Sequence, residues 1–177
     1  MSDISSPNEA TDQNYTISIP KIPTSNTGLH GCLPKGMIGI TRTGVAIYNP
    51  VTSENFNAVE GPAKETIDTC GGHPNIHGAY HYHEIPCSCL YNREVDEFIG
   101  VALDGFPIYG PRASDIDHLI TSADLDKCHG REVNGAYRYH ATTTWPYVLG
   151  CYKGMVMERN IDYSCDTSTV SGIVFKL

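Results

Sequence analysis

The stretch that decides the fold is His77-Gly78-Ala79-Tyr80-His81-Tyr82-His83, which returns 57 residues later as Asn134-Gly135-Ala136-Tyr137-Arg138-Tyr139-His140. In both copies tyrosines alternate with histidine or arginine. A period of two residues is typical of a β-strand, because successive side chains point to opposite faces. Two copies are too few for a solenoid. We therefore predict a pseudo-symmetric pair of Tyr-x-Tyr-His strands that meet in one core.

The rest of the chain also favours strands over helices. The 17 Gly and 11 Pro interrupt long helices. Residues 37–40 and 45–48 flank a short turn, as in a β-hairpin. The fold class predicted is mainly β, β-rich with long loops and few short helices. Residues 1–14 are polar and are expected to form a flexible N-terminal arm, while residues 15–177 form a single domain.

Composition excludes two classes of partner. The net charge is −8 with only 12 Lys+Arg, and no basic cluster stands out, so nucleic-acid binding is not expected. No apolar run approaches the ~20 residues of a transmembrane helix, so no membrane span is expected. The partner expected is a small molecule or none, and the sequence does not address the oligomeric state.

The seven cysteines indicate a compartment. Such a count is ordinary in secreted proteins and high for a reduced cytosol. Metal ligation by cysteine is the competing interpretation, but the chain has no CxxC framework of the zinc type. We expect a secreted, extracellular or periplasmic protein with disulfides and one cysteine left over, although no signal peptide is visible in this chain.

The histidines suggest a metal site. His81 and His83 share one face of their strand, and their imidazoles can converge on one ion. His140 of the second copy is the expected third ligand, and His73 lies nearby in the sequence. Imidazole ligands suit copper or zinc, of which copper is preferred, and do not suit magnesium or calcium. The alternative is an exposed pair of histidines that binds no metal.

Further motifs carry a resemblance. Cys70-Gly71-Gly72-His73-Pro74, the Tyr-His-Tyr-His tetrapeptide, the stretch Leu103–Pro111 and the segment Tyr137–Cys151 together resemble the YHYH-domain family over about residues 28–154. His129 departs from the small polar residue expected at its position. The resemblance implies a secreted or periplasmic protein and no settled activity. Within these motifs each copy is bracketed by cysteines, which suggests the disulfides Cys70–Cys87 and Cys128–Cys151.

Four residues of these motifs are candidates for supporting roles. Asp104 is either a turn residue that caps backbone amides or a carboxylate that supports a ligating histidine or acts as a general base. Tyr109 is a candidate catalytic phenol and Tyr82 a candidate substrate contact, with core packing as the alternative for both. Arg138 either binds an anionic substrate or pairs with a carboxylate.

Three functions follow from these residues. The first is a three-histidine copper or zinc site, with metal-activated water or oxygen chemistry on a small substrate. The second is a non-catalytic extracellular recognition or structural module that disulfides stabilise. The third is copper storage or delivery.

Overall fold

The computed structural model describes residues 7–25, 33–86, 88 and 90–157. Its strands form one mixed eight-stranded sheet, and its only helix within these ranges is a short 3-10 turn, Ser122–Asp124. The prediction of a β-rich fold with few short helices is therefore confirmed. The strands are β1 (Met37–Thr41), β2 (Ala46–Tyr48), β3 (Gly72–Pro74), β4 (Tyr80–Tyr82), β5 (Phe98–Ala102), β6 (Pro107–Tyr109), β7 (Gly130–Val133) and β8 (Ala136–His140).

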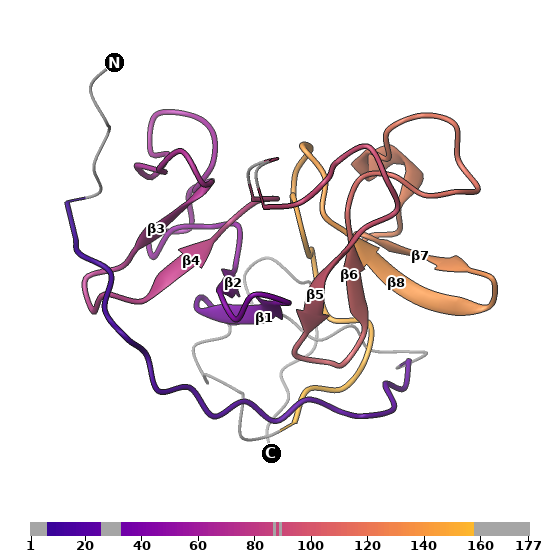
Figure 1. Ribbon diagram of the computed structural model, residues 1–177, viewed down its shortest axis with the longest axis horizontal. Coiled ribbons are helices and arrows are strands. Elements are labelled where there is room, and N and C mark those ends of the chain that lie inside the picture. The colour runs from indigo at the N-terminus through magenta and orange to yellow at the C-terminus, as the bar shows by residue number, and fades with distance from the viewer. Residues whose placement is uncertain (1–6, 26–32, 87, 89, 158–177) are drawn as a thin grey trace.

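The order of the strands reveals two equivalent halves. The sheet runs β3-β4-β2-β1-β5-β6-β8-β7, so the strands of one half appear in the reverse order of the other. In each half a hairpin (β1–β2 or β5–β6) pairs in parallel with a Tyr-x-Tyr-His strand (β4 or β8), which in turn pairs antiparallel with its upstream neighbour. Figure 1 shows the halves on either side of the central pair β1 and β5.

The duplication extends well beyond the seven-residue repeat. Gly44-Val45-Ala46-Ile47-Tyr48-Asn49-Pro50 in one half matches Gly105-Phe106-Pro107-Ile108-Tyr109-Gly110-Pro111 in the other. Between the halves, β1 and β5 approach so closely that a Cβ at Gly39 would lie 2.9 Å from the carbonyl oxygen of Val101, and one at Gly100 would lie 2.2 Å from that of Ile40. Glycine is therefore required at both equivalent positions.

The core draws equivalent side chains from the two halves. Ile38 and Ile47 of the first hairpin and Ile99 and Ile108 of the second are all at most 2 % exposed. Their burial from water is the main force that holds the halves together.

The turn before each Tyr-x-Tyr-His strand is also built twice. In the first half, Asp68 Oδ1 accepts the backbone N–H groups of Cys70 and Gly72 and the hydroxyl of Tyr80. In the second half, Asp126 Oδ1 accepts the equivalent backbone N–H groups of Cys128 and Gly130 and the hydroxyl of Tyr137. The tyrosine and aspartate of each repeat are therefore structural.

The cysteines confirm one predicted bridge and correct the other. Cys128 and Cys151 form a disulfide. Cys70 has a free thiol, so the prediction of a Cys70–Cys87 bridge is wrong; Cys87 itself lies outside the described residues. The reason is the path of the chain. The segment after β8 folds back over the Cys128 turn, where Gly150 N–H donates to the Cys128 carbonyl, whereas the segment after β4 leads on to the central strand β5.

The N-terminal residues pack against the first half of the sheet. Residues 7–14, part of the expected arm, lack regular secondary structure but hydrogen bond to the turn between β3 and β4.

Within the described ranges, no helix has the length and apolarity needed to cross a membrane.

Candidate metal centre

Three histidines and one glutamate meet on one face of β3 and β4. His73 and His81 are paired across these antiparallel strands. His83 follows β4 and faces the same way as His81, as its spacing predicts. Glu65 comes from the loop before β3, where its backbone N–H donates to the carbonyl of Ala58. One ligand atom from each of these four side chains lies within 4.8 Å of all the others. We call this group the His–Glu cluster.

The distances within the His–Glu cluster are those of side chains gathered around one point. His81 Nε2 and His83 Nε2 are 3.0 Å apart. Glu65 Oε2 lies 2.6 Å from His73 Nε2 and 3.3 Å from His83 Nε2. Ligand atoms around a tetrahedral ion with bonds of ~2.0–2.1 Å are roughly 3.3 Å apart. The separations are therefore compatible with a small adjustment around a single ion.

The hydrogen bonds of two imidazoles determine which nitrogens can ligate. His81 Nδ1 lies 2.9 Å from the carbonyl oxygen of Ala79, and His83 Nδ1 lies 2.6 Å from that of Asn49. A carbonyl oxygen only accepts, so each Nδ1 carries the hydrogen and a neutral ring has its lone pair on Nε2. When both rings are neutral, their Nε2 lone pairs face each other at 3.0 Å, an arrangement that becomes favourable when a cation lies between them.

The remaining two members of the cluster fit the same interpretation. His73 Nε2 is buried and has no hydrogen-bond partner among the described residues, despite its short distance to Glu65. Contacts with His73 and His83 hold the pKa of the Glu65 carboxyl well below its usual range, so it is ionised. Burial lowers the pKa of His81 to about 3, so its ring is neutral. Neutral imidazoles and a carboxylate are the forms that bind metals.

A tyrosine supports the cluster from behind. The ring of Tyr48, at the end of β2, stacks on His81 with 3.9 Å between ring centroids and 21° between planes. Burial raises the pKa of Tyr48 to about 12, so its hydroxyl is protonated. Together with the Ala79 carbonyl, this stacking fixes the orientation of the His81 ring.

His140 does not join the cluster. It lies on β8, and four strands separate β8 from β4 in the sheet. His140 Nδ1 donates to the carbonyl of Gly110 at 2.8 Å, the counterpart of the contact between His83 and Asn49. Its Nε2 accepts from Arg138 Nε at 3.2 Å. His140 is thus the equivalent of His83 in the second half, where it faces a guanidinium.

Arg138 and Tyr109 lie together in the second half. The Arg138 guanidinium packs over the Tyr109 ring at 4.3 Å from its centroid, and its two terminal nitrogens each lie 3.1 Å from an oxygen of Asp96. Arg138 is only 8 % exposed. Two roles were predicted for Arg138, binding of an anionic substrate or pairing with a carboxylate. The structure shows it paired with the carboxylate of Asp96. Tyr109 contacts this ion pair and is distant in sheet order from the His–Glu cluster.

Asp104 and Tyr82 lie in the interior. Asp104 is fully buried, accepts the Tyr139 hydroxyl at 2.5 Å and the backbone N–H of Gly154 at 2.9 Å, and thereby holds the segment after the disulfide. Burial raises its pKa. Tyr82 is 2 % exposed on the face of β4 opposite the histidines, and burial raises its pKa to about 12. Neither contacts the cluster.

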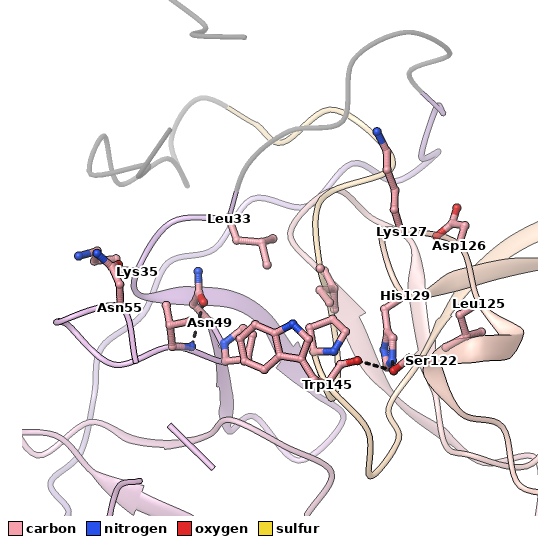
Figure 2. A pocket seen from close by; sticks show the side chains of 15 residues that line it. Leu33, Lys35, Asn49, Asn55, Ser122, Leu125, Asp126, Lys127, His129 and Trp145 are labelled. Carbon is pink, nitrogen blue, oxygen red and sulfur yellow. Dashed lines mark hydrogen bonds between the residues drawn. The ribbon is translucent and has the colours of Figure 1, made fainter. Parts of the chain in front are cut away.

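A pocket of about 530 Å³ lies between the halves, and of the described residues that line it none belongs to the His–Glu cluster. Figure 2 shows Trp145 beside His129 and Ser122 in this pocket. Ser122 Oγ lies 3.0 Å from His129 Nε2, while His129 Nδ1 lies 3.1 Å from the Val148 carbonyl oxygen. The Ser122 hydroxyl also contacts Thr144 Oγ1 at 2.7 Å and the Trp145 carbonyl. These contacts attach the 3-10 turn to the loop after β8.

Two functional residues escaped the sequence analysis. Glu65 stands in a turn-rich loop without periodicity, and nothing in its surroundings distinguishes it from the other acidic residues. Tyr48 carried a usable signal, because the Gly-x-x-Ile-Tyr-x-Pro pattern that contains it returns at Tyr109. The duplicated Gly-x-x-Ile-Tyr-x-Pro pattern would have predicted an aromatic ring beside each Tyr-x-Tyr-His strand.

Comparisons with known proteins give one result. No curated protein and no solved structure matches the chain. The family model described as YHYH protein matches residues 16–118 and 112–154. These ranges contain both halves of the sheet, the four residues of the His–Glu cluster and the Cys128–Cys151 disulfide. The chain therefore belongs to the YHYH protein family.

Proposed function

We propose that this protein binds one zinc or copper ion through His73, His81, His83 and Glu65. The observation that carries the proposal is the pair of Nε2 atoms 3.0 Å apart, with both Nδ1 atoms facing carbonyl oxygens. An ion between the two rings would accept one bond from each Nε2. Three imidazoles and one carboxylate form a donor set that suits zinc and copper and does not suit magnesium or calcium.

The ion has a structural role in this proposal. Four protein ligands complete a tetrahedral shell, as in structural zinc sites, whereas catalytic sites keep an open position. An ion would also connect β3, β4 and the loop that carries Glu65. Asp104 and Tyr109, the candidates for chemistry on a small substrate, lie away from the cluster, so the geometry supports metal binding better than catalysis.

The direct test is metal content. Protein purified without a histidine tag and reconstituted with Zn²⁺ or Cu²⁺ should hold one equivalent after dialysis, by elemental analysis. His83→Ala should reduce this content to near zero, because it removes a ligand and its support on Asn49. His140→Gln is the matched control, since His140 occupies the equivalent place in the second half, and it should keep one equivalent. Equal metal content in the two variants would refute the assignment of the cluster.

The compartment is inferred from the disulfide. The Cys128–Cys151 bridge supports an oxidising location, extracellular or periplasmic, because such bonds are rare in reducing compartments. Alkylation of protein taken directly from its source, followed by peptide mapping, should label Cys70 and leave Cys128 and Cys151 unlabelled. Labelling of the latter pair would argue against this location.

A further inference from the structure

The N-terminal segment, residues 8–15, lies along the hairpin that carries two of the proposed ligands. The backbone N–H of Thr11 donates to the carbonyl of Gly78 at 2.9 Å, in the turn between β3 and β4. Gln13 Nε2 donates to the carbonyl of His77 at 3.3 Å in the same turn. Figure 1 shows this segment in indigo as it passes beside β3 and β4. The segment is therefore attached to the end of the ligand-bearing hairpin.

The turn is shaped to receive this segment. Gly78 has φ +76°, and a Cβ at this position would lie 2.2 Å from Thr11 Oγ1. Glycine thus serves two purposes here, the left-handed backbone and the close approach of Thr11. A third contact, from Asn8 Nδ2 to the carbonyl of Pro74 at 3.2 Å, reaches β3 next to the ligand His73.

The same segment reaches the back of the cluster. The Tyr15 side chain lies near the Tyr48 hydroxyl and, after burial, contributes to its raised pKa, and the Tyr48 ring stacks on His81 at 3.9 Å. The segment therefore contacts the hairpin at its turn and at β3, and it also contacts Tyr48, which stacks on His81. Groups that hold a ligand in place contribute strongly to metal affinity although they do not touch the ion.

The second half offers a comparison for this arrangement. Its equivalent turn contains Gly135 with φ +79°, and a Cβ there would meet nothing within 4 Å. The face of Tyr109, the equivalent of Tyr48, is covered by Arg138. The contacts of the segment with Pro74, His77, Gly78 and Tyr48 all lie in the half that carries the histidines.

We propose that residues 8–15 form a strap that holds the β3–β4 hairpin closed on the bound ion, so that retention of the metal depends on the seated strap. This inference rests on the proposed function. With the strap in place, His73 and His81 keep their registration across the two strands. Without it, the turn and the Tyr48 ring lose their outer support, and ions leave more readily.

The test compares two glycine variants of the 177-residue chain. Gly78→Ala and Gly135→Ala impose the same left-handed strain on equivalent turns, but only the former places a methyl group against Thr11. Both proteins are loaded with Zn²⁺, and its release to an excess of chromogenic chelator is followed. We expect release from Gly78→Ala to be about tenfold faster than from Gly135→Ala, the scale of effect seen when support of a ligand is lost.

A rescue variant keeps the result specific. Thr11→Gly removes the atoms that the new methyl group would meet, so Gly78→Ala/Thr11→Gly should return toward the release rate of Gly135→Ala. Equal release from the two single variants of a protein that binds Zn²⁺ would overturn the strap alone. Failure of the unmodified protein to take up Zn²⁺ or Cu²⁺ would overturn the proposed function, and with it this inference.

Discussion

Each half of the sheet buries one histidine through the same hydrogen bond to a backbone carbonyl. The charged and polar side chains around that histidine differ between the halves. His83 and His140 each donate through Nδ1 to a carbonyl that follows a hairpin strand. In the second half, the Nε2 of His140 accepts from Arg138, which also pairs with Asp96. In the first half, the Nε2 of His83 meets another imidazole nitrogen and a carboxylate oxygen.

This difference shows what the first half lacks. The second half contains one cationic and one anionic side chain around a neutral imidazole. The first half contains an ionised Glu65 among three imidazoles, and no lysine or arginine belongs to the cluster. Buried charge requires compensation. A divalent ion in the first half would supply the positive charge that a guanidinium supplies in the second.

The largest change in the free energy of unfolding is expected when the guanidinium of Arg138 is removed from the second half. Arg138→Met should lower the free energy of unfolding by about 3 kcal/mol, because it removes a buried guanidinium from its contacts with Asp96, His140 and Tyr109. Urea denaturation at neutral pH measures this loss. Arg138→Met/Asp96→Asn removes both charges and should recover most of it. A cost below about 1 kcal/mol for the single variant would mean that this ion pair is as weak as a surface pair.

The next effect concerns the bound cation itself. A metal at a hundred times its dissociation constant stabilises a protein by about 2.7 kcal/mol, so chelation should lower the unfolding free energy of the metal-loaded protein by about that amount. His73→Ala/His81→Arg brings the arginine of the second half into the first and provides space for it. This variant should fold without metal and show no response to chelator.

A control separates this result from simple loss of the site. His73→Ala/His81→Ala also removes two ligands but supplies no positive charge. Chelator should leave its unfolding free energy unchanged as well, but that free energy should be lower than in the arginine variant. If the two variants were equally stable, the comparison between guanidinium and metal ion would be wrong.

Much of the fold could be predicted from the sequence because its signals are local. The alternation in Tyr80-His81-Tyr82-His83 indicates a strand with two distinct faces, and the hairpin at residues 37–48 follows from two short apolar runs around a turn. The disulfide Cys128–Cys151 could also be predicted, because these two cysteines bracket the second repeat. The Cys70–Cys87 bridge was wrong because sequence symmetry was extended to a segment whose path differs between the halves.

The site could be predicted only where its residues share a strand or neighbouring strands. His81 and His83 lie two residues apart, and His73 pairs with His81 in register. His140 was assigned to the same group because two similar strands were expected to meet. Instead the pseudo-twofold arrangement places β4 and β8 on opposite sides of the central pair. Glu65 comes from a loop, and only tertiary structure brings it to the histidines.

The effect that is smallest at neutral pH is a pH dependence in the second half. Burial, together with the charge of Arg138, lowers the pKa of His140 from 6.5 to about 4. Between these values the unfolded chain binds a proton that the folded chain does not, so the unfolding free energy should fall by about 1.4 kcal/mol per pH unit as the pH decreases. His140→Gln retains an acceptor for Arg138 but does not titrate. Urea denaturation from pH 7 to pH 4.5 should therefore give a shallower acid loss for this variant, and parallel curves would show that the pKa of His140 is the same in the folded and the unfolded chain.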